Sequence, residues 1–141
     1  MSKFIIRKDT YSVSQIVDKL RSNELKFNMN GKVEPSLIEL LMQHSMVDAI
    51  VAKTLPNDEG MKIFNGFTLL RTLNYYIIEN NPLENLQWLP DFEEFLFSDL
   101  PRSYQRRVEE SDIDVYLDDS LDPDNEELIE RYANTLNNSK E

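Results

Sequence analysis

The stretch from Met61 to Glu79 constrains the fold most, because its hydrophobic periodicity changes at a single Asn65-Gly66 pair. Before the pair, a short apolar run follows a turn-rich segment at residues 56–60, which is typical of the second strand of a hairpin. After the pair, apolar residues recur at helical spacing, which predicts a largely buried helix that begins at Phe67. The pair is therefore predicted to join a strand to a helix.

A joint of this kind has two interpretations. The first turn of a helix has free backbone N–H groups, and glycine allows a close approach, so Asn65-Gly66 is a natural site for an anion. The structural alternative is that Asn65 caps the helix and Gly66 makes the turn. The periodicity alone favours the structural alternative.

The length and composition indicate one domain. A chain of 141 residues with 40% hydrophobic residues is long enough to bury a single core. The absence of cysteine excludes disulfides, thiolate catalysis and cysteine-based zinc sites, and it is typical of a reducing cytoplasm. No apolar run approaches the roughly 20 residues of a membrane-spanning helix. We therefore expect a cytoplasmic protein without a membrane contact, with a single domain at residues 1–137 and a frayed tail at residues 138–141.

The net charge of −11 is concentrated in the last quarter of the chain. Residues 109–141 contain 12 acidic and 2 basic side chains, whereas residues 1–108 contain 14 acidic and 13 basic ones. A neutral body argues against direct nucleic-acid binding, whose affinity comes largely from Lys and Arg that displace counterions. The acidic quarter at residues 109–137 is either a solvated face or a surface that binds a basic partner or imitates a phosphate backbone. The sequence favours the solvated face.

The remaining pattern predicts a small sheet with flanking helices. Strands are expected at residues 3–7, 25–29, 47–53, 61–64 and 112–117. Four helices besides the one from Phe67 are expected to follow Ser12 or Ser14, Glu34-Pro35, Leu100-Pro101 and Asp122-Pro123. The fold class expected from this order is α+β.

Residues 88–97 contain four aromatic side chains, beginning with Trp88. Acidic residues stand between them, so this segment is interpreted as a flap packed on the core and not as a stacking surface for nucleic acid. The short helix that follows is expected to present three arginines outward: Arg102, Arg106 and Arg107.

No catalytic or metal-binding set is evident in the sequence. The single histidine, His44, lies at the end of a predicted helix, so no multi-histidine metal site can be assembled. Asp112, Asp114 and Asp118 resemble part of a calcium-binding loop, but the required glycine and terminal glutamate are missing. The sequence therefore leans away from enzyme activity.

Four phrases in order resemble a known family: IFNGFTLLRTL at residues 63–73, LPRSYQRRV at 100–108, DIDVYL at 112–117 and ERYANTLNN at 130–138. They resemble the N-terminal domain of the GmrSD-type, modification-dependent restriction proteins, which belongs to the ParB/sulfiredoxin-like superfamily. The resemblance spans most of the chain, and the nuclease half of those proteins has no counterpart in it. It implies a ParB-like fold, with a small mixed sheet and flanking helices.

The departures from the family pattern fall where its nucleotide chemistry lies. The family's Asp is replaced by Asn65, its two glutamines by Phe67 and Thr68, and its arginine by Leu69. Arg71 comes two positions later, about 200° around a helix, and is expected on the opposite face. The segment at residues 27–33 also lacks the family's Gln-Arg pair and tryptophan. The resemblance therefore implies a kept scaffold with an altered, non-catalytic pocket.

The function predicted from these observations is that of a non-catalytic protein-binding module without a cofactor. Its expected partner is a nucleic-acid-processing or defence enzyme of a host, which suits a viral or mobile-element product. The predicted docking residues in the altered pocket, the flap and the following helix are Phe67, Leu69, Trp88, Arg102, Arg106 and Arg107.

Two alternatives stay open. The first is a retained site for a nucleoside triphosphate with Mg, formed by Asn65, Gly66, Thr68 and Lys32. The second is an acidic mimic of DNA, whose carboxylates at Asp114, Asp118, Glu126 and Glu130 would occupy a groove-reading protein.

Overall fold

The structure is a computed structural model that describes residues 4–138. The strands are β1 (Ile6–Ser12), β2 (Leu25–Lys26), β3 (Ile50–Thr54), β4 (Met61–Asn65) and β5 (Asp112–Asp118). The helices are α1 (Val13–Arg21), α2 (Ser36–Met42), α3 (Phe67–Leu73), α4 (Arg102–Glu109) and α5 (Glu126–Asn138). A π-helical segment, Asn74–Ile78, continues α3, and two 3-10 turns, Pro90–Phe92 and Phe97–Asp99, precede α4. Of the predicted tail, Asn138 is the last residue of α5, and residues 139–141 lie outside the described part.

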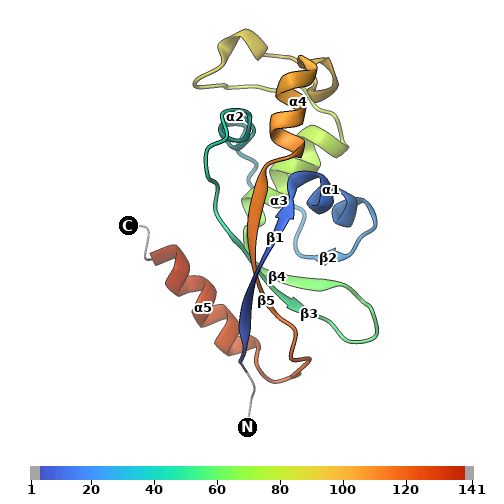
Figure 1. Cartoon of the computed structure of the whole chain (residues 1–141), viewed down its shortest axis with the longest axis vertical. Helices are drawn as coiled ribbons and strands as arrows, with labels where there is room; N and C mark the ends of the chain where they lie inside the picture. The colour runs from blue at the N-terminus through green and yellow to red at the C-terminus, as the bar shows by residue number, and fades with distance from the viewer. Residues whose placement is uncertain (1–3, 139–141) are drawn as a thin grey trace.

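The five strands form one mixed sheet in the order β1-β5-β3-β4-β2 (Figure 1). The β1–β5 and β3–β4 pairs are antiparallel, whereas the β5–β3 and β4–β2 pairs are parallel. The predicted α+β class, with a small mixed sheet and flanking helices, is confirmed. The hairpin predicted around residues 56–60 is the β3–β4 pair.

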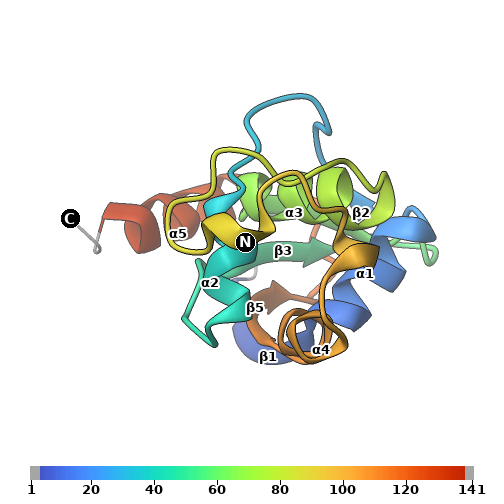
Figure 2. The same ribbon diagram turned by 90° about the horizontal axis from the view of Figure 1, so that it is seen from above.

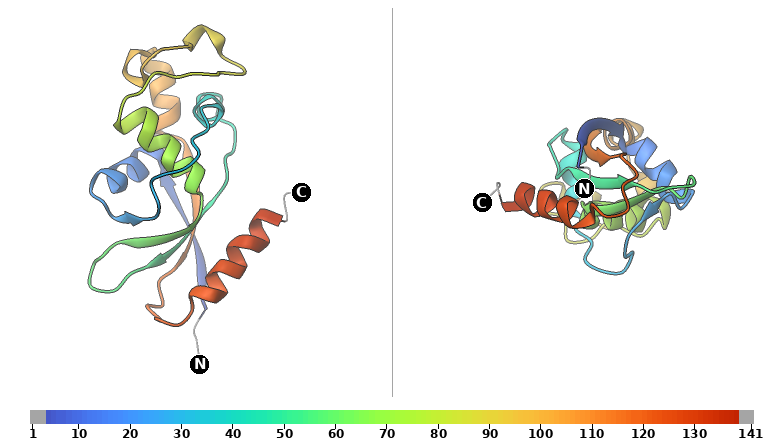
Figure 3. Two further views of the ribbon diagram at one scale, coloured as in Figure 1. Left: turned by 180° about the vertical axis from the view of Figure 1, so that it is seen from behind. Right: turned by 90° about the horizontal axis from the view of Figure 1, so that it is seen from below.

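The two faces of the sheet are covered differently. Alternate side chains of β3 serve opposite faces, with Ile50 and Ala52 in the main core and Val51 in a second, smaller cluster. The main core lies beneath α1, α2, α3 and α4, which surround the strands in the view from above (Figure 2). The second cluster is closed by Ile129 and Ala133 of α5. Seen from behind, α5 and the β3–β4 turn extend to opposite sides of the molecule (Figure 3).

Three strand predictions are displaced from the observed strands. The first strand runs over Ile6–Ser12 and not over residues 3–7, because its register is set by pairing with β5 from Ile6–Asp118 to Ser12–Asp112. The strand expected at residues 25–29 has only two residues, and the one expected at residues 47–53 begins at Ile50. The limits of a strand depend on the distant partners that it pairs with, which local alternation does not reveal.

The predicted helix starts are close to the observed ones. Ser12, and not Ser14, caps α1, and its side chain and that of Gln15 form a reciprocal capping box. The long helix ends as predicted before Pro82, where the backbone and side-chain N–H groups of Asn81 both donate to the Tyr75 carbonyl. The acidic C-terminal helix begins at Glu126, later than the Asp122-Pro123 signal.

Gly60 allows β2 to join the sheet. It has a φ of 100°, and a Cβ atom there would lie 2.0 Å from the Glu24 carbonyl oxygen. That same oxygen accepts a 2.7 Å hydrogen bond from the Met61 N–H. A side chain at residue 60 would therefore separate β2 from β4.

Candidate functional site

A pocket of about 360 Å³ lies at the joint between β4 and α3. It brings together all of the residues predicted for a nucleotide site and two of those predicted for partner docking: Lys32, Asn65, Gly66, Thr68, Phe67 and Leu69. Lys32 is more than thirty positions before the others in the sequence. The fold therefore brings Lys32, from the segment at residues 27–33, next to the segment at residues 65–69.

The joint itself is made by Gly66, whose φ of 95° is in the left-handed region. A Cβ atom there would lie 2.9 Å from Cγ1 of Ile50, so glycine is required both by the backbone conformation and by the packing on β3. Asn65 does not cap α3, contrary to the structural alternative, because its side-chain N–H donates to the Ala49 carbonyl at 3.0 Å. Asn65 thereby ties the end of β4 to the segment before β3.

Two side chains of α3 hold the loop that carries Lys32. The Nε of Arg71 donates to the Asn28 carbonyl at 2.9 Å, and its guanidinium lies over the Phe67 ring at 5.8 Å. Thr72 is buried, accepts a hydrogen bond from the Glu34 N–H at 2.9 Å and donates to the Thr68 carbonyl at 2.6 Å. Arg71 thus positions the loop over the pocket and is not one of the pocket-lining residues.

The electrostatics of this pocket oppose a polyphosphate. Glu34 and Asp48 also line it, and the Nζ of Lys32 lies 3.6 Å from a Glu34 carboxylate oxygen. Phosphate binding favours uncompensated cations and N–H donors, whereas here the one lysine is paired and a second carboxylate is nearby. Within residues 4–138, no group of three or more His, Asp or Glu side chains could hold a metal ion.

Leu69 and Trp88 occupy different environments. Leu69 is only 2% exposed and belongs to the main core, so it contributes a small part of the pocket wall and no free apolar surface. Trp88 is 49% exposed, so this residue of the predicted flap is not packed on the core. Phe92 of the same segment is packed as predicted, with its ring 4.9 Å from that of Tyr104.

Glu39 is the residue that the sequence analysis missed. It is 0% exposed on α2, and its carboxylate accepts hydrogen bonds from the N–H groups of Gln87, Trp88 and Leu89 at 2.8, 2.7 and 2.7 Å. A carboxylate with three backbone donors is an anchor for the loop that presents Trp88. The available signal was a lone acid inside the apolar run of residues 37–42.

The three arginines of α4 are not equivalent. Arg102 and Arg106 are exposed as predicted, and Arg102 pairs with Glu109 at 3.0 Å. The outward position predicted for Arg107 is wrong. Its guanidinium lies over the Tyr104 ring at 4.7 Å and donates to the Met42 carbonyl at 3.4 Å, which joins α4 to α2.

The four acids proposed for DNA mimicry do not form one exposed surface. Asp118 was expected on the outer face of β5, but it is 0% exposed and accepts hydrogen bonds from Ser120 and Asn125. Asp114 is 3.7 Å from the Nζ of Lys8. Glu130 is exposed on α5. Burial of Asp118 and pairing of Asp114 argue against a regular array of free carboxylates.

Glu126, the fourth acid, lies between two lysines. Its carboxylate is 2.5 Å from the Nζ of Lys62 and 3.8 Å from that of Lys53. The hydrogen bond from Lys62 holds the pKa of Glu126 below its ordinary value. In the main core the shift has the opposite sign and cause, since burial raises the pKa of Tyr76 to about 12.

Comparisons of this chain with protein-family models, with curated proteins and with solved structures found no match. Within residues 4–138, no helix has the length and apolar character needed to cross a membrane.

Proposed function

We propose that this chain is a non-catalytic protein-binding module on a ParB-like scaffold. In this proposal the β4–α3 pocket receives a basic side chain of a partner protein. The observation that carries it is the composition of the pocket: the apolar side chains of Phe67 and Leu37 lie beside the carboxylates of Glu34 and Asp48. An arginine or lysine has the matching form, an apolar stem that ends in a cation.

The ParB-like assignment rests on the order of the sequence phrases and on where their residues lie. The loop at residues 27–33 and the joint at Asn65-Gly66 hold the family's nucleotide boxes in the resemblance, and in this chain both contribute to one pocket. A shared scaffold in which the site has changed its ligand accounts for this coincidence.

The charge of the whole chain supports a basic partner. With a net charge of −11, the protein attracts positively charged surfaces over several ångströms and accelerates their encounter. Enzymes that process nucleic acids carry such surfaces, because they neutralise phosphates. A nucleic-acid-processing or defence enzyme of the host is therefore the proposed partner. Trp88 is proposed as a second contact, because it is exposed on a loop whose backbone is held by Glu39.

The test is a pull-down from the native host with mass spectrometry, followed by calorimetry with the purified partner. The pocket variant combines Glu34→Gln with Asp48→Asn, and its control combines Glu59→Gln with Glu79→Gln, two exposed acids outside the pocket. We expect the pocket variant to lose at least about tenfold in affinity, and the control to lose little. Trp88→Ala should also weaken binding. Equal affinities of the pocket variant and its control would overturn the proposal.

The nucleotide alternative keeps one observation in its favour, which is that Lys32, Asn65, Gly66 and Thr68 line the same pocket. Titration of ATP, CTP and GTP with Mg by calorimetry tests it directly. The two functions predict opposite effects of Lys32→Gln, which should abolish nucleotide binding but leave the binding of a basic partner intact or stronger. Binding weaker than about millimolar for all three nucleotides would remove this alternative.

A further inference from the structure

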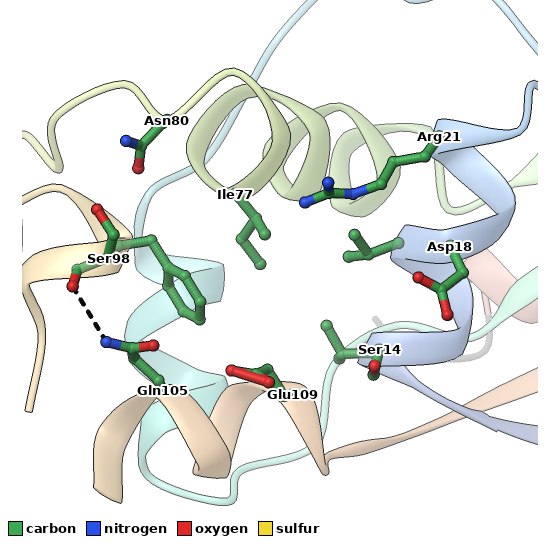
Figure 4. Close-up of a pocket in the computed structure, with 11 residues that line it drawn as sticks. Ser14, Asp18, Arg21, Ile77, Asn80, Ser98, Gln105 and Glu109 are labelled. Carbon is green, nitrogen blue, oxygen red and sulfur yellow. Dashed lines mark hydrogen bonds between the residues drawn. The ribbon is translucent and has the colours of Figure 1, made fainter. Parts of the chain in front are cut away.

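A larger pocket, of about 490 Å³, lies between α1, α4, the π-helical end of α3 and the 3-10 turn at Phe97–Asp99 (Figure 4). It shares no lining residue with the β4–α3 pocket. Its volume falls in the range of about 300–1,000 Å³ that is typical of small-molecule sites. None of the functions proposed above uses it.

The floor of this pocket is apolar. Val13, Val17 and Phe97 are buried members of the main core, and Ile77 packs against that core and points into the pocket (Figure 4). These side chains come from three different elements of the fold, so the floor is fixed by tertiary packing. It offers a place for the apolar part of a ligand.

The rim carries charges of both signs. Arg21 is at the end of α1 and extends toward Ile77, while Asp18, three residues earlier, lies on the same helix (Figure 4). The two could pair across one helical turn, but the described residues contain no ion pair or side-chain hydrogen bond of Arg21 or Asp18. Both groups are therefore open to a ligand.

The opposite wall is preorganised by α4. The side-chain N–H of Gln105 donates to the Ser98 and Leu100 carbonyls at 3.2 and 2.8 Å. Arg102 donates to both Gln105 and Glu109 at 3.0 Å, which fixes the Glu109 carboxylate at the pocket and leaves its second oxygen free of Arg102. Arg102 is not one of the lining residues, but its ion pair with Glu109 offsets the charge of that carboxylate, and the remaining rim charges of Arg21 and Asp18 balance each other.

We infer that this pocket binds a small zwitterion with an apolar body, the chemistry shared by free α-amino acids and short peptides with free termini. The ligand carboxylate pairs with Arg21, which can form two parallel hydrogen bonds to it. The ligand ammonium faces Asp18 and Glu109, and the apolar body lies on Ile77 and Phe97. A balanced rim favours such a ligand over a simple anion or cation, because neither of those satisfies both groups of charges.

The experiment is a nuclear magnetic resonance titration of the whole chain with four probes: L-leucine, the dipeptide leucyl-leucine, isocaproate and isoamylamine. Isocaproate keeps only the carboxylate of leucine, and isoamylamine keeps only the ammonium. We expect at least one zwitterion to shift the Ile77 methyl and Gln105 amide signals, and each half-ligand to bind at least about tenfold more weakly. The tighter of leucine and leucyl-leucine identifies the source.

Two variants of rim residues separate the roles of the charges. Arg21→Gln should weaken the zwitterion and isocaproate about tenfold while sparing isoamylamine, and Asp18→Asn combined with Glu109→Gln should do the reverse. Arg131→Gln, on α5, is the matched control and should change nothing. Thermal unfolding of each variant verifies that it folds. The inference is overturned if no probe shifts these signals, or if Arg21→Gln binds the zwitterion as tightly as the parent.

Discussion

The two faces of the sheet are held by different forces. The face beneath α1–α4 buries a large apolar core, whereas the face beneath α5 buries a small cluster around Val51 and Ile129. Beside that small cluster lie two buried charged side chains, Lys53 at 3% exposure and Asp118 at 0%. The Nζ of Lys53 donates to the Asp122 carbonyl at 2.7 Å, and Asp118 accepts from Asn125 at 3.0 Å.

The two faces therefore have different roles: one supplies most of the stability of the domain, and the other fixes the position of α5. Apolar burial is non-directional and grows with area, so the α1–α4 face supplies most of the free energy of folding. Buried charges cost free energy unless each has its partner, so the α5 face accepts only one position of the segment that leads into α5. We therefore expect damage to the first face to unfold the domain, and damage to the second to release α5.

The largest effect is expected for Leu70→Ala on the α1–α4 face. Leu70 is fully buried, and the cavity left by its side chain should lower the free energy of unfolding by about 3–4 kcal/mol. Chemical denaturation measures this loss. Leu121→Ala is the control, because Leu121 is exposed and its truncation should change stability by less than about 0.5 kcal/mol. A small loss at Leu70 would show that this face is not the main source of stability.

A smaller effect is expected for Glu39→Gln, which alters the buried carboxylate of the same face. The new amide can no longer accept hydrogen bonds at both ends, so one or two N–H groups of Gln87–Leu89 lose their partner, at about 2 kcal/mol. Amide hydrogen exchange should accelerate at residues 87–89, with a change in Trp88 fluorescence. Glu79→Gln, at an exposed site, should leave both signals unaltered. Unchanged exchange at residues 87–89 would contradict the anchoring role of Glu39.

On the α5 face, Lys53→Met should lower the free energy of unfolding by only about 1 kcal/mol. The loss is small because an apolar side chain of similar length replaces a buried ion. The loss of its contacts to Asp122 and Glu126 should nevertheless raise hydrogen exchange throughout α5. Lys62→Met removes a half-exposed lysine that also pairs with Glu126, and its effect should be smaller. A global destabilisation as large as that of Leu70→Ala would erase the contrast between the faces.

The smallest effect is the pH dependence carried by Glu126. Because Lys62 lowers its pKa in the folded state, the stabilisation is complete above the ordinary value of 4.5 and is lost as the pH falls through the lowered value. Hydrogen exchange in α5 should therefore accelerate in that acidic range while the α1–α4 face stays protected. The variant Glu126→Gln should show a flatter acid profile in α5. Identical profiles for the parent and this variant would assign the acid response to other carboxylates.

Local sequence patterns predicted most of the helices and strands, whereas the surroundings of individual side chains depend on residues that are distant in the sequence. The β3–β4 hairpin and the joint at Gly66 were predictable because turn residues and a change of period mark them in the sequence. The burial of Asp118 was not, since alternation along β5 places it opposite its buried neighbour Leu117 and gives no sign of the Asn125 contact. The position of the Arg107 side chain was likewise not predictable, because it depends on contacts with the Tyr104 ring and with a carbonyl of another helix.

The candidate site was likewise only partly predictable from the sequence. The sequence placed Asn65, Gly66 and Thr68 together because they are near neighbours in the chain, and Lys32 was proposed with them as the cation of a nucleotide site. It did not predict that Glu34 and Asp48 would line the same pocket, where Glu34 pairs with Lys32 and Asp48 adds a second carboxylate that disfavours a polyphosphate. The pocket beside Arg21 could not be predicted from the sequence, because its walls come from four segments that no local sequence pattern relates.

The position of β5 between β1 and β3 has a consequence for synthesis on the ribosome. The register pairs Ser12 with Asp112, so β1 has no strand partner until the chain has grown by about a hundred residues. Until then β1 and one edge of β3 expose unpaired backbone groups, which can pair with other chains. Closing so long a loop also slows folding, because its entropy is lost before the strand contacts form. The nascent chain is therefore expected to depend on chaperones until residue 118 has emerged, and its yield should fall when translation is fast relative to folding.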